Sequence, residues 1–137
     1  MNFFVAGKPY GKSRPRTTVV GGYARIYTEP KALKYEEYVR DCCKIENGNF
    51  EPIPGYISMT IEAVFPIPKQ TTKKDRQAML DGSLKPDKKP DLDNIAKTIC
   101  DALNGFAYDD DKQIIELIIR KKYGSEPGVY VGLNPIE

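Results

Sequence analysis

Histidine and long apolar runs are both missing from this sequence of 137 residues. Without histidine, the chain can form neither a Ser-His or Cys-His nucleophile system nor a zinc site that depends on histidine. Its cysteines are odd in number and lack the spacing of metal ligands, so we predict reduced, structural thiols at Cys42, Cys43 and Cys100. The sequence has no N-terminal signal pattern and no apolar run near the ~18 residues of a membrane span, which predicts a cytoplasmic protein with no membrane partner. Any enzyme of this composition must use carboxylates, lysines or a metal ion for proton transfer.

A large excess of one charge is also missing, since the formal net charge is +2 at pH 7. The overall charge therefore says little about partners, and its distribution is more informative. Acidic residues concentrate at 91–111, and basic residues at 8–16, 69–76 and 85–89. With 40% apolar and 29% charged residues, the composition is that of an ordinary globular chain, and the length predicts a single domain over residues 1–137.

The order of apolar patterns predicts an α+β fold, with a small, mainly antiparallel or mixed sheet packed with two main helices. Strands are expected over 1–6, 56–65, 113–123 and 129–133, and a hairpin over 17–27 around Gly21-Gly22. The strand over 113–123 is apolar on both faces, which favours a central or doubly covered position, and 129–133 is expected to return beside it as a hairpin. Helices are expected from Thr28, as N-cap, to about residue 45, over 72–80 between Thr72 and Gly82, and from 91 to a left-handed cap at Gly105.

The last of these helices has the clearest pattern in the chain. Its apolar residues recur at i, i+3, i+4 and i+7 and predict one buried stripe, formed by Leu92, Ile95, Ala96, Ile99 and Leu103. The opposite arc of the helix is polar and carries Asp91, Asp93, Asn94, Lys97 and Asp101. Three consecutive aspartates, 109–111, follow after a short turn. The two acidic groups are therefore expected to converge on one point in space.

Carboxylates without histidine or thiolate are the ligands of Mg²⁺ or Mn²⁺ rather than of zinc or copper. Asp91, Asp93, Asp110 and Asp111 are the candidate ligands. An ion held by them can polarise a phosphodiester, and Lys97, one helical turn beyond Asp93, can stabilise the developing charge or orient the attacking water. As a corollary, Asp91, Asp93 and Asp111 should lie close enough to share a cation, and their mutual repulsion should raise the pKa of at least one of them.

Purely structural roles for the same residues stay open. Asp91 after a proline can be an N-cap and Asp93 a first-turn charge, each stabilising the helix by ~0.5–1 kcal/mol. Asp93 and Lys97 can form an exposed i, i+4 ion pair that contributes roughly 0.3 kcal/mol. The aspartates at 109–111 can be a polar loop tip.

The basic loop over residues 7–16 contains Gly11-Lys12-Ser13 but does not match a phosphate-cradling P-loop. That motif needs a glycine five positions before Gly11, where this chain has Ala6. We therefore predict no nucleotide cofactor. The loop is either a solvated turn or an arm that contacts DNA phosphates. The predicted DNA contacts are Lys8, Lys12, Arg14, Arg16, Lys88 and Lys89.

The acidic stretch resembles the RusA family of Holliday junction resolvases. The resemblance rests on Lys89-Pro90-Asp91-Leu92-Asp93-Asn94-Ile95, Lys97, Asp101-Ala102-Leu103-Asn104-Gly105, Tyr108, Asp110-Asp111 and Gln113-Ile114. The basic N-terminal segment is similar to that of members found in phages and prophages.

This resemblance implies a Mg²⁺-dependent endonuclease, with Mn²⁺ as a substitute, that acts as a homodimer. Such enzymes make paired, symmetric nicks in four-way DNA junctions during recombination and repair. By matching position, Asp91, Asp93 and Asp111 are the expected catalytic metal ligands, Asp110 neighbours the last of them, and Lys97 is the essential lysine. Two alternatives remain: a DNA-binding module of the same fold without catalysis, and a metal nuclease for other branched DNA such as flaps or forks.

Overall fold

The computed structural model describes residues 1–12, 16–27 and 29–137, with no side-chain description for residues 16–18, 20 and 23–27. Thr28, the predicted helix cap, and Arg14, a predicted DNA contact, lie outside the described residues. The elements in chain order are β1 (Asn2–Ala6), β2 (Arg16–Val20), β3 (Tyr23–Tyr27), α1 (Pro30–Asn47), β4 (Tyr56–Pro66), α2 (Lys73–Asp81), α3 (Leu92–Leu103), the 3-10 turn η1 (Asp111–Gln113), β5 (Ile114–Gly124) and β6 (Gly128–Ile136).

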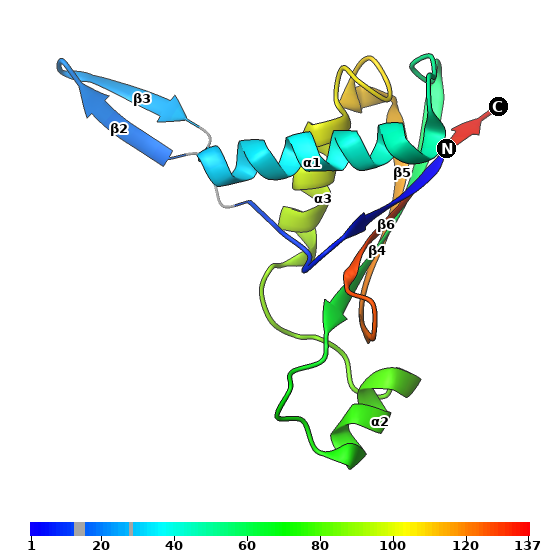
Figure 1. The fold of residues 1–137 in the computed structure, drawn as a ribbon. Coiled ribbons are helices and arrows are strands. Elements are labelled where there is room, and N and C mark those ends of the chain that lie inside the picture. The colour runs from blue at the N-terminus through cyan, green and yellow to red at the C-terminus, as the bar shows by residue number, and fades with distance from the viewer. Residues whose placement is uncertain (13–15, 28) are drawn as a thin grey trace.

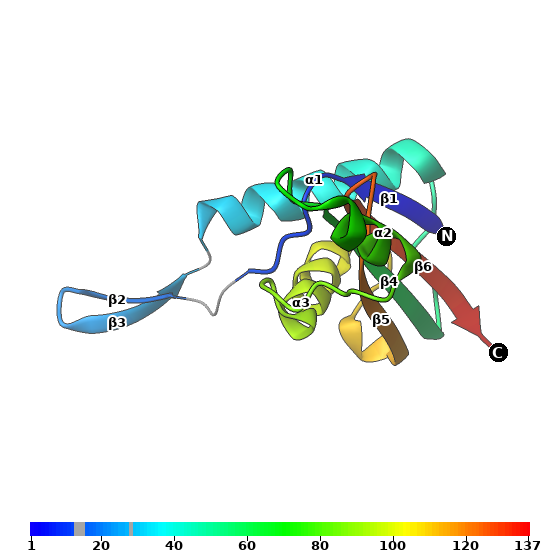
Figure 2. The same cartoon turned by 90° about the horizontal axis from the view of Figure 1, so that it is seen from below.

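A four-stranded mixed sheet in the order β1-β6-β4-β5 forms the body of the domain. β6 runs antiparallel to both β1 and β4, whereas β5 is parallel to β4 because α2 and α3 lie on the connection between them. Helices α1 and α3 cover one face of this sheet, and the other face is open (Figures 1 and 2). The fold is therefore α+β, as the sequence predicted.

The predicted position of β5 is wrong in two respects. β5 is an edge strand rather than a central one, and it does not form a hairpin with β6, because β4 lies between them. β4 takes the inner place because its alternate residues are fully buried under the helices, from Ile57 to Phe65. As a result, three large apolar side chains of β5 remain exposed, Ile115 at 58%, Leu117 at 42% and Ile118 at 42%.

The core lies between the sheet and the two long helices. From α3 it takes Ile95, Ile99 and Leu103, which are each at most 1% exposed, together with Thr98 and Ala102 on the same side of the helix. Leu92, in contrast, is 38% exposed at the first position of α3, so the buried stripe begins one turn later than predicted. This packing places the polar side of α3, with its aspartates and Lys97, at the surface.

The helix boundaries follow local sequence signals. The Thr72 side chain caps α2 by accepting a hydrogen bond from the Asp75 amide, and Gly82 ends α2 as a left-handed cap with a φ of +88°. The left-handed cap predicted at Gly105 is wrong: the C-cap of α3 is Asn104 in extended conformation, and Gly105, with a φ of +73°, belongs to the turn that follows. α1 has Glu29 at its N-cap position and extends to Asn47, two residues beyond the predicted end.

The β2–β3 hairpin confirms the turn predicted at Gly21-Gly22 and extends away from the rest of the domain (Figure 1). All three cysteines are free thiols. The described helices include none that is long and apolar enough to cross a bilayer.

Candidate functional site

Asp91 and Asp93 lie at the exposed start of α3. Asp91 occupies the N-cap position with extended backbone, but its side chain makes no capping hydrogen bond. The helix therefore begins without using the Asp91 carboxylate, so this residue does not act as the ordinary side-chain cap considered above. Asp93 follows in the first turn, where a negative charge interacts favourably with the helix dipole. Both carboxylates are thus presented to solvent at one end of the helix.

Lys97 lies one turn further along α3, with its side chain 66% exposed. Its ammonium Nζ lies 3.5 Å from Asp101 Oδ1, so the i, i+4 pair on this helix is Lys97–Asp101 rather than the Asp93–Lys97 pair considered above as a structural role. An exposed pair of this kind contributes only a few tenths of a kcal/mol, ~0.3–0.5. Lys97 can therefore be recruited by a stronger anion, such as a DNA phosphate, at little cost.

Asp111 is half-buried at the start of η1, beyond the C-terminal end of α3. The hydroxyl of the fully buried Tyr108 lies 2.9 Å from Asp111 Oδ1 and 3.0 Å from the Cys100 carbonyl oxygen. The Asp111 amide donates to Asn104 Oδ1 at 3.1 Å. These contacts fix the position of the Asp111 carboxyl from both its side chain and its backbone.

The aspartate run is an ordered turn held by Gln113. The Gln113 side-chain oxygen accepts from the amides of Asp109 and Asp110, at 2.9 and 3.1 Å, and its nitrogen donates to two carbonyls in the segment before β4. The Asp110 side chain accepts from the Lys112 amide at 2.9 Å and completes a capping box with Gln113. Asp110 therefore has a local structural role, in addition to its predicted role beside the metal.

The acids of this chain fall into two groups along α3 instead of one. Asp91 and Asp93 are at its start, whereas Asp101 and Asp111 are near its end, and eight residues of helix separate Asp93 from Asp101 by ~12 Å. Among the described residues, no three carboxylates or thiols come together as a metal-binding group. The expected convergence of Asp91, Asp93 and Asp111 on one cation is therefore not realised within the described chain.

The donor chemistry at the start of α3 nevertheless fits a hard divalent cation. Mg²⁺ usually takes one or two protein carboxylates and keeps several waters or substrate oxygens. Asp91 and Asp93 are exposed carboxylates, and Asp91 is free of the capping bond that would compete for it. These two residues supply the protein ligands that such an ion requires.

The pKa of Asp111 is raised, although not by the acids that were expected to raise it. Burial is the largest cause and the charges of Asp101 and Asp110 add to it, while the Tyr108 hydrogen bond and the charge of Lys97 act in the opposite direction. The electrostatic neighbours of Asp111 are thus the groups at the end of α3.

This shift leads to a prediction for Asp111→Asn. A carboxyl with a raised folded-state pKa opposes folding once it ionises, so stability falls as the pH rises through that pKa. Asparagine stays neutral, so we expect a higher Tm than wild type at pH 7 and no gain at pH 3, below the unfolded-state pKa of about 3.9. Thermal unfolding at both pH values, with Asp109→Asn as the exposed control, measures this. A lower Tm at pH 7 would contradict it.

Lys12 lies in an ion cluster that joins three parts of the chain. Its Nζ is 2.5 Å from Asp101 Oδ2 on α3 and 3.2 Å from Glu36 Oε2 on α1, and its amide donates to Thr98 Oγ1 at 2.9 Å. Glu36 is only 8% exposed, so its carboxylate is largely buried between the elements of the cluster. The cluster anchors the segment after β1 between the two long helices, as Figure 2 shows for the chain path. The ammonium of Lys12 already has two carboxylate partners, which compete with any DNA phosphate for it. Its role as a phosphate contact stays a prediction.

Lys12→Met is expected to destabilise the domain, because it leaves Glu36 and Asp101 facing each other without the cation between them. Removing one partner of a fully buried ion pair lowers the free energy of unfolding by about 3–5 kcal/mol. The side chains of this cluster keep some exposure, so we expect a loss of up to about 3 kcal/mol. Urea denaturation measures the loss. Adding Glu36→Gln should recover part of it, and Lys34→Gln, at an exposed site on α1, should have little effect. A wild-type midpoint for Lys12→Met would contradict the assignment.

The other predicted DNA contacts that the structure describes do not form one cluster, and two of them lie beside the start of α3. Lys8 and Lys89 line one pocket there together with Asp91. Lys88 Nζ lies 5.5 Å from the centre of the Tyr123 ring, and the Lys88 carbonyl accepts from Lys121 Nζ at 2.6 Å. Arg16 is the first residue of β2.

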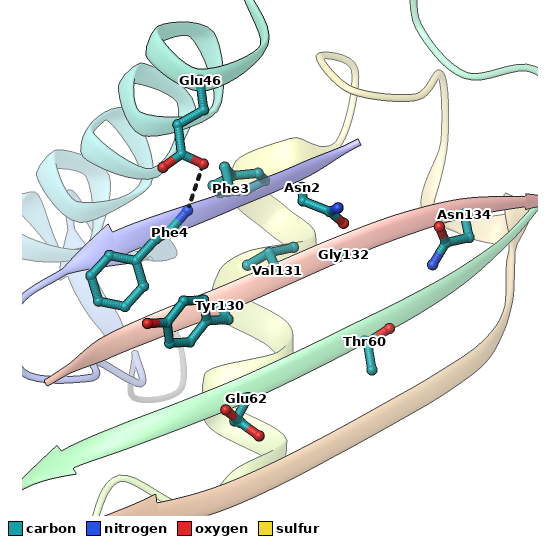
Figure 3. Close-up of a pocket in the computed structure, with 10 residues that line it drawn as sticks. All are labelled: Asn2, Phe3, Phe4, Glu46, Thr60, Glu62, Tyr130, Val131, Gly132 and Asn134. Atoms are coloured by element: carbon teal, nitrogen blue, oxygen red, sulfur yellow. Dashed lines mark hydrogen bonds between the residues drawn. The ribbon is translucent and has the colours of Figure 1, made fainter. Parts of the chain in front are cut away.

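A second groove, of about 510 Å³, lies on the open face of the sheet. Figure 3 shows Phe4 and Tyr130 side by side on this face, their ring centres 4.3 Å apart, with Thr60 and Glu62 on the neighbouring strand. None of the predicted catalytic residues lines this groove. The candidate site is therefore on the helical side of the domain.

The comparisons with known proteins agree with the resemblance noted from the acidic motif. The model of the family "Endodeoxyribonuclease RusA" matches residues 6–134, nearly the whole chain. The chain is also similar to the uncharacterized protein YqaN of Bacillus subtilis (strain 168), with 32% identity over 141 residues that cover 99% of this chain and 96% of that protein. The protein is thus of the endodeoxyribonuclease class, an enzyme that acts on DNA. Within that class it belongs to the RusA family.

Proposed function

We propose that this protein is a Mg²⁺-dependent, structure-selective endonuclease that resolves four-way DNA junctions by paired nicks. The observation that carries the proposal is the pair of exposed carboxylates, Asp91 and Asp93, followed one turn later by Lys97, in a chain of the RusA family. These side chains supply the two groups that phosphodiester hydrolysis without histidine requires, namely ligands for a cation and a fixed positive charge.

In this proposal Asp91 and Asp93 hold the ion. Asp111, flanked by Asp110, is a third catalytic acid, but from its place beyond the other end of α3 it is not a ligand of that same ion. When bound, Mg²⁺ supplies Lewis-acid activation of the phosphodiester and can be replaced by Mn²⁺. Lys97 stabilises the negative charge that develops on the phosphate, because its exposed ammonium is held only by the weak pair with Asp101. The buried Tyr108 orients Asp111 through its hydroxyl.

In this proposal the basic residues bind the DNA, because the acids repel it until a cation neutralises them. The proposed contacts are Lys8, Lys12, Arg14, Arg16, Lys88 and Lys89. When binding depends on phosphate neutralisation, the logarithm of the binding constant falls linearly with log[salt], with a slope close to −0.9 for each phosphate contact. A protein with this set of bases should therefore bind junction DNA much less tightly at high salt.

We further propose that the active species is a homodimer, since a four-way junction has approximate two-fold symmetry that a two-fold dimer can match. The edge strand β5 supports this. It carries the exposed Ile115, Leu117 and Ile118 beside unpaired backbone groups, and an apolar edge strand of this kind is a site of association.

The decisive experiment incubates the purified protein with a labelled four-way junction and Mg²⁺. Nicks at symmetric positions on opposed strands, absent in EDTA, support the proposal, and no cleavage with any divalent cation contradicts it. Binding without cleavage would indicate a DNA-binding module of this fold. Faster cleavage of flaps or replication forks in a substrate panel would indicate a nuclease for other branched DNA.

A further inference from the structure

A pocket of about 630 Å³ opens next to the proposed metal ligands. It lies between the segment that follows β1, the start of α1 and the start of α3, and Asp91 and Asn94 form part of its wall. A DNA strand held at Asp91 must therefore pass its mouth. The volume is within the ~300–1,000 Å³ of pockets that bury a small organic ligand, so it is large enough for one nucleotide.

The pocket is a fixed feature of the fold, because Gly11 allows the N-terminal segment to lie directly on α3. A Cβ at position 11 would be 2.7 Å from Pro90 Cβ and 2.9 Å from Asn94 Cβ. Any other residue here would push the segment away from the helix. Immediately after Gly11, the hydrogen bond from the Lys12 amide to Thr98 and the two ion pairs of Lys12 hold the segment in place.

The lining combines cations with aromatic rings. Three lysines from three different segments, Lys8, Lys31 and Lys89, stand against one carboxylate, that of Asp91. The rings of Tyr10 and Tyr35 pack against each other with their centres 5.0 Å apart and their planes tilted by 32°, and Lys31 Nζ lies 5.6 Å from the centre of the Tyr10 ring. Ammonium groups bind phosphate, and an aromatic ring binds an unstacked base. A purely anionic ligand would leave the tyrosines unused, and a purely apolar one would leave the lysines unused.

We propose that this pocket binds one nucleotide of the DNA strand, adjacent to the phosphate that is cut, with its base against Tyr10 and its phosphate held by the three lysines. The inference rests on the proposed function and extends it, since it assigns roles to Tyr10 and Lys31 in holding the substrate strand. A base taken out of its stack is easiest to obtain near a branch point, where stacking is already interrupted. The pocket thus favours strands at junctions over continuous duplex.

The test compares intact four-way junctions with junctions that carry a single abasic nucleotide at each position near the branch point. Affinity is measured by fluorescence anisotropy in EDTA, so that it does not depend on cleavage, and nicking is measured separately in Mg²⁺. At one position next to the cut, removal of the base should weaken wild-type binding about 5- to 100-fold, the range that base–aromatic stacking provides. Tyr10→Leu should bind the intact junction as weakly as wild type binds that abasic one, and should not distinguish the two. Tyr10→Phe, which keeps the ring, should behave as wild type.

Lys31→Gln should weaken binding and reduce the magnitude of the slope of log K against log[salt] by about one, as loss of one phosphate contact does. Lys44→Gln, the same change near the opposite end of α1, should leave the slope unchanged. The inference is overturned if removal of the base weakens binding by the same factor for Tyr10→Leu and for wild type on every abasic junction. It is also overturned if Lys31→Gln and Lys44→Gln have the same affinity and the same salt slope. If wild type nicks no junction, the proposed function fails, but the abasic comparison in EDTA still decides the pocket.

Discussion

Asp93→Asn is expected to abolish detectable nicking while leaving junction binding intact. The substitution keeps the size of the side chain and removes the negative charge with which Asp93 would hold Mg²⁺. Activation by a bound ion provides several kcal/mol of transition-state stabilisation, and each 1.36 kcal/mol is a factor of ten, so the rate should fall by at least about 100-fold. Because the lost charge is negative, affinity for the junction in EDTA should stay equal or rise.

Asp87→Asn is the matched control, since it removes an exposed carboxylate four residues before Asp91 without touching α3. It should nick at the wild-type rate. Single-turnover cleavage of a labelled junction gives the rates, and thermal unfolding shows that both variants are folded. Full activity of Asp93→Asn would remove Asp93 from the site and leave the DNA-binding module as the better description.

What could be predicted from the sequence was largely local. The polar arc of α3 follows from helical spacing alone, so Asp91, Asp93 and Lys97 do lie on the exposed side of the helix. The caps of α2 at Thr72 and Gly82 rest on residues whose conformational preferences do not depend on the rest of the chain.

Strand pairing could not be predicted in the same way, because it depends on which strands compete for the inner place. β5 and β6 are joined by a short turn, and this favours a hairpin. β4 pairs with both of them instead, since its fully buried face belongs in the middle of the sheet. The apolar residues of β5 predict a covered strand, and the cover is absent from the described part of this chain.

The position of the third acid was also beyond local reasoning. Asp111 is placed by the buried ring of Tyr108 and by Asn104, on a turn that Gln113 ties to the segment before β4. The ion cluster of Lys12 joins residues far apart in the sequence. One signal for it was present: Glu36 lies at helical spacing within the apolar stripe of α1, between Ala32 and Val39, where a charge needs a buried partner.

Ile118→Arg is expected to convert the proposed dimer into a monomer. If two copies of β5 pair antiparallel with Ile118 at the two-fold axis, Glu116 of one copy lies opposite Arg120 of the other, and Leu117 opposite Ile119. The strand is then complementary to itself in charge as well as in apolar character, as stable cross-strand pairs require. A residue at the axis faces its own copy, so an arginine there meets a like charge and also removes the isoleucine contact.

Full burial of an isoleucine contributes ~1.5–3 kcal/mol, but Ile118 is 42% exposed before association, so its burial at the interface contributes about 0.6–1.3 kcal/mol in each copy. The substitution changes both copies at once, so the dimer dissociation constant should rise by at least about 10-fold. Sedimentation velocity over a range of protein concentrations measures it. Ile45→Arg is the control, because it makes the same change at an exposed position far from β5. Ile45 lies on α1 and is 82% exposed. Glu116→Arg and Arg120→Glu should each weaken the dimer, and their combination should restore part of the affinity, which only this pairing register predicts.

The same variant separates assembly from chemistry. A monomer that keeps Asp91, Asp93 and Lys97 retains the groups proposed for one nick but has no second site held across the junction. Ile118→Arg should therefore produce single nicks on junctions, with the paired cuts lost more severely than the total cutting. A monomeric wild-type protein at tens of micromolar, or a variant that stays dimeric, would show that β5 is not the interface, and paired cutting by a monomer would show that the two nicks need no dimer.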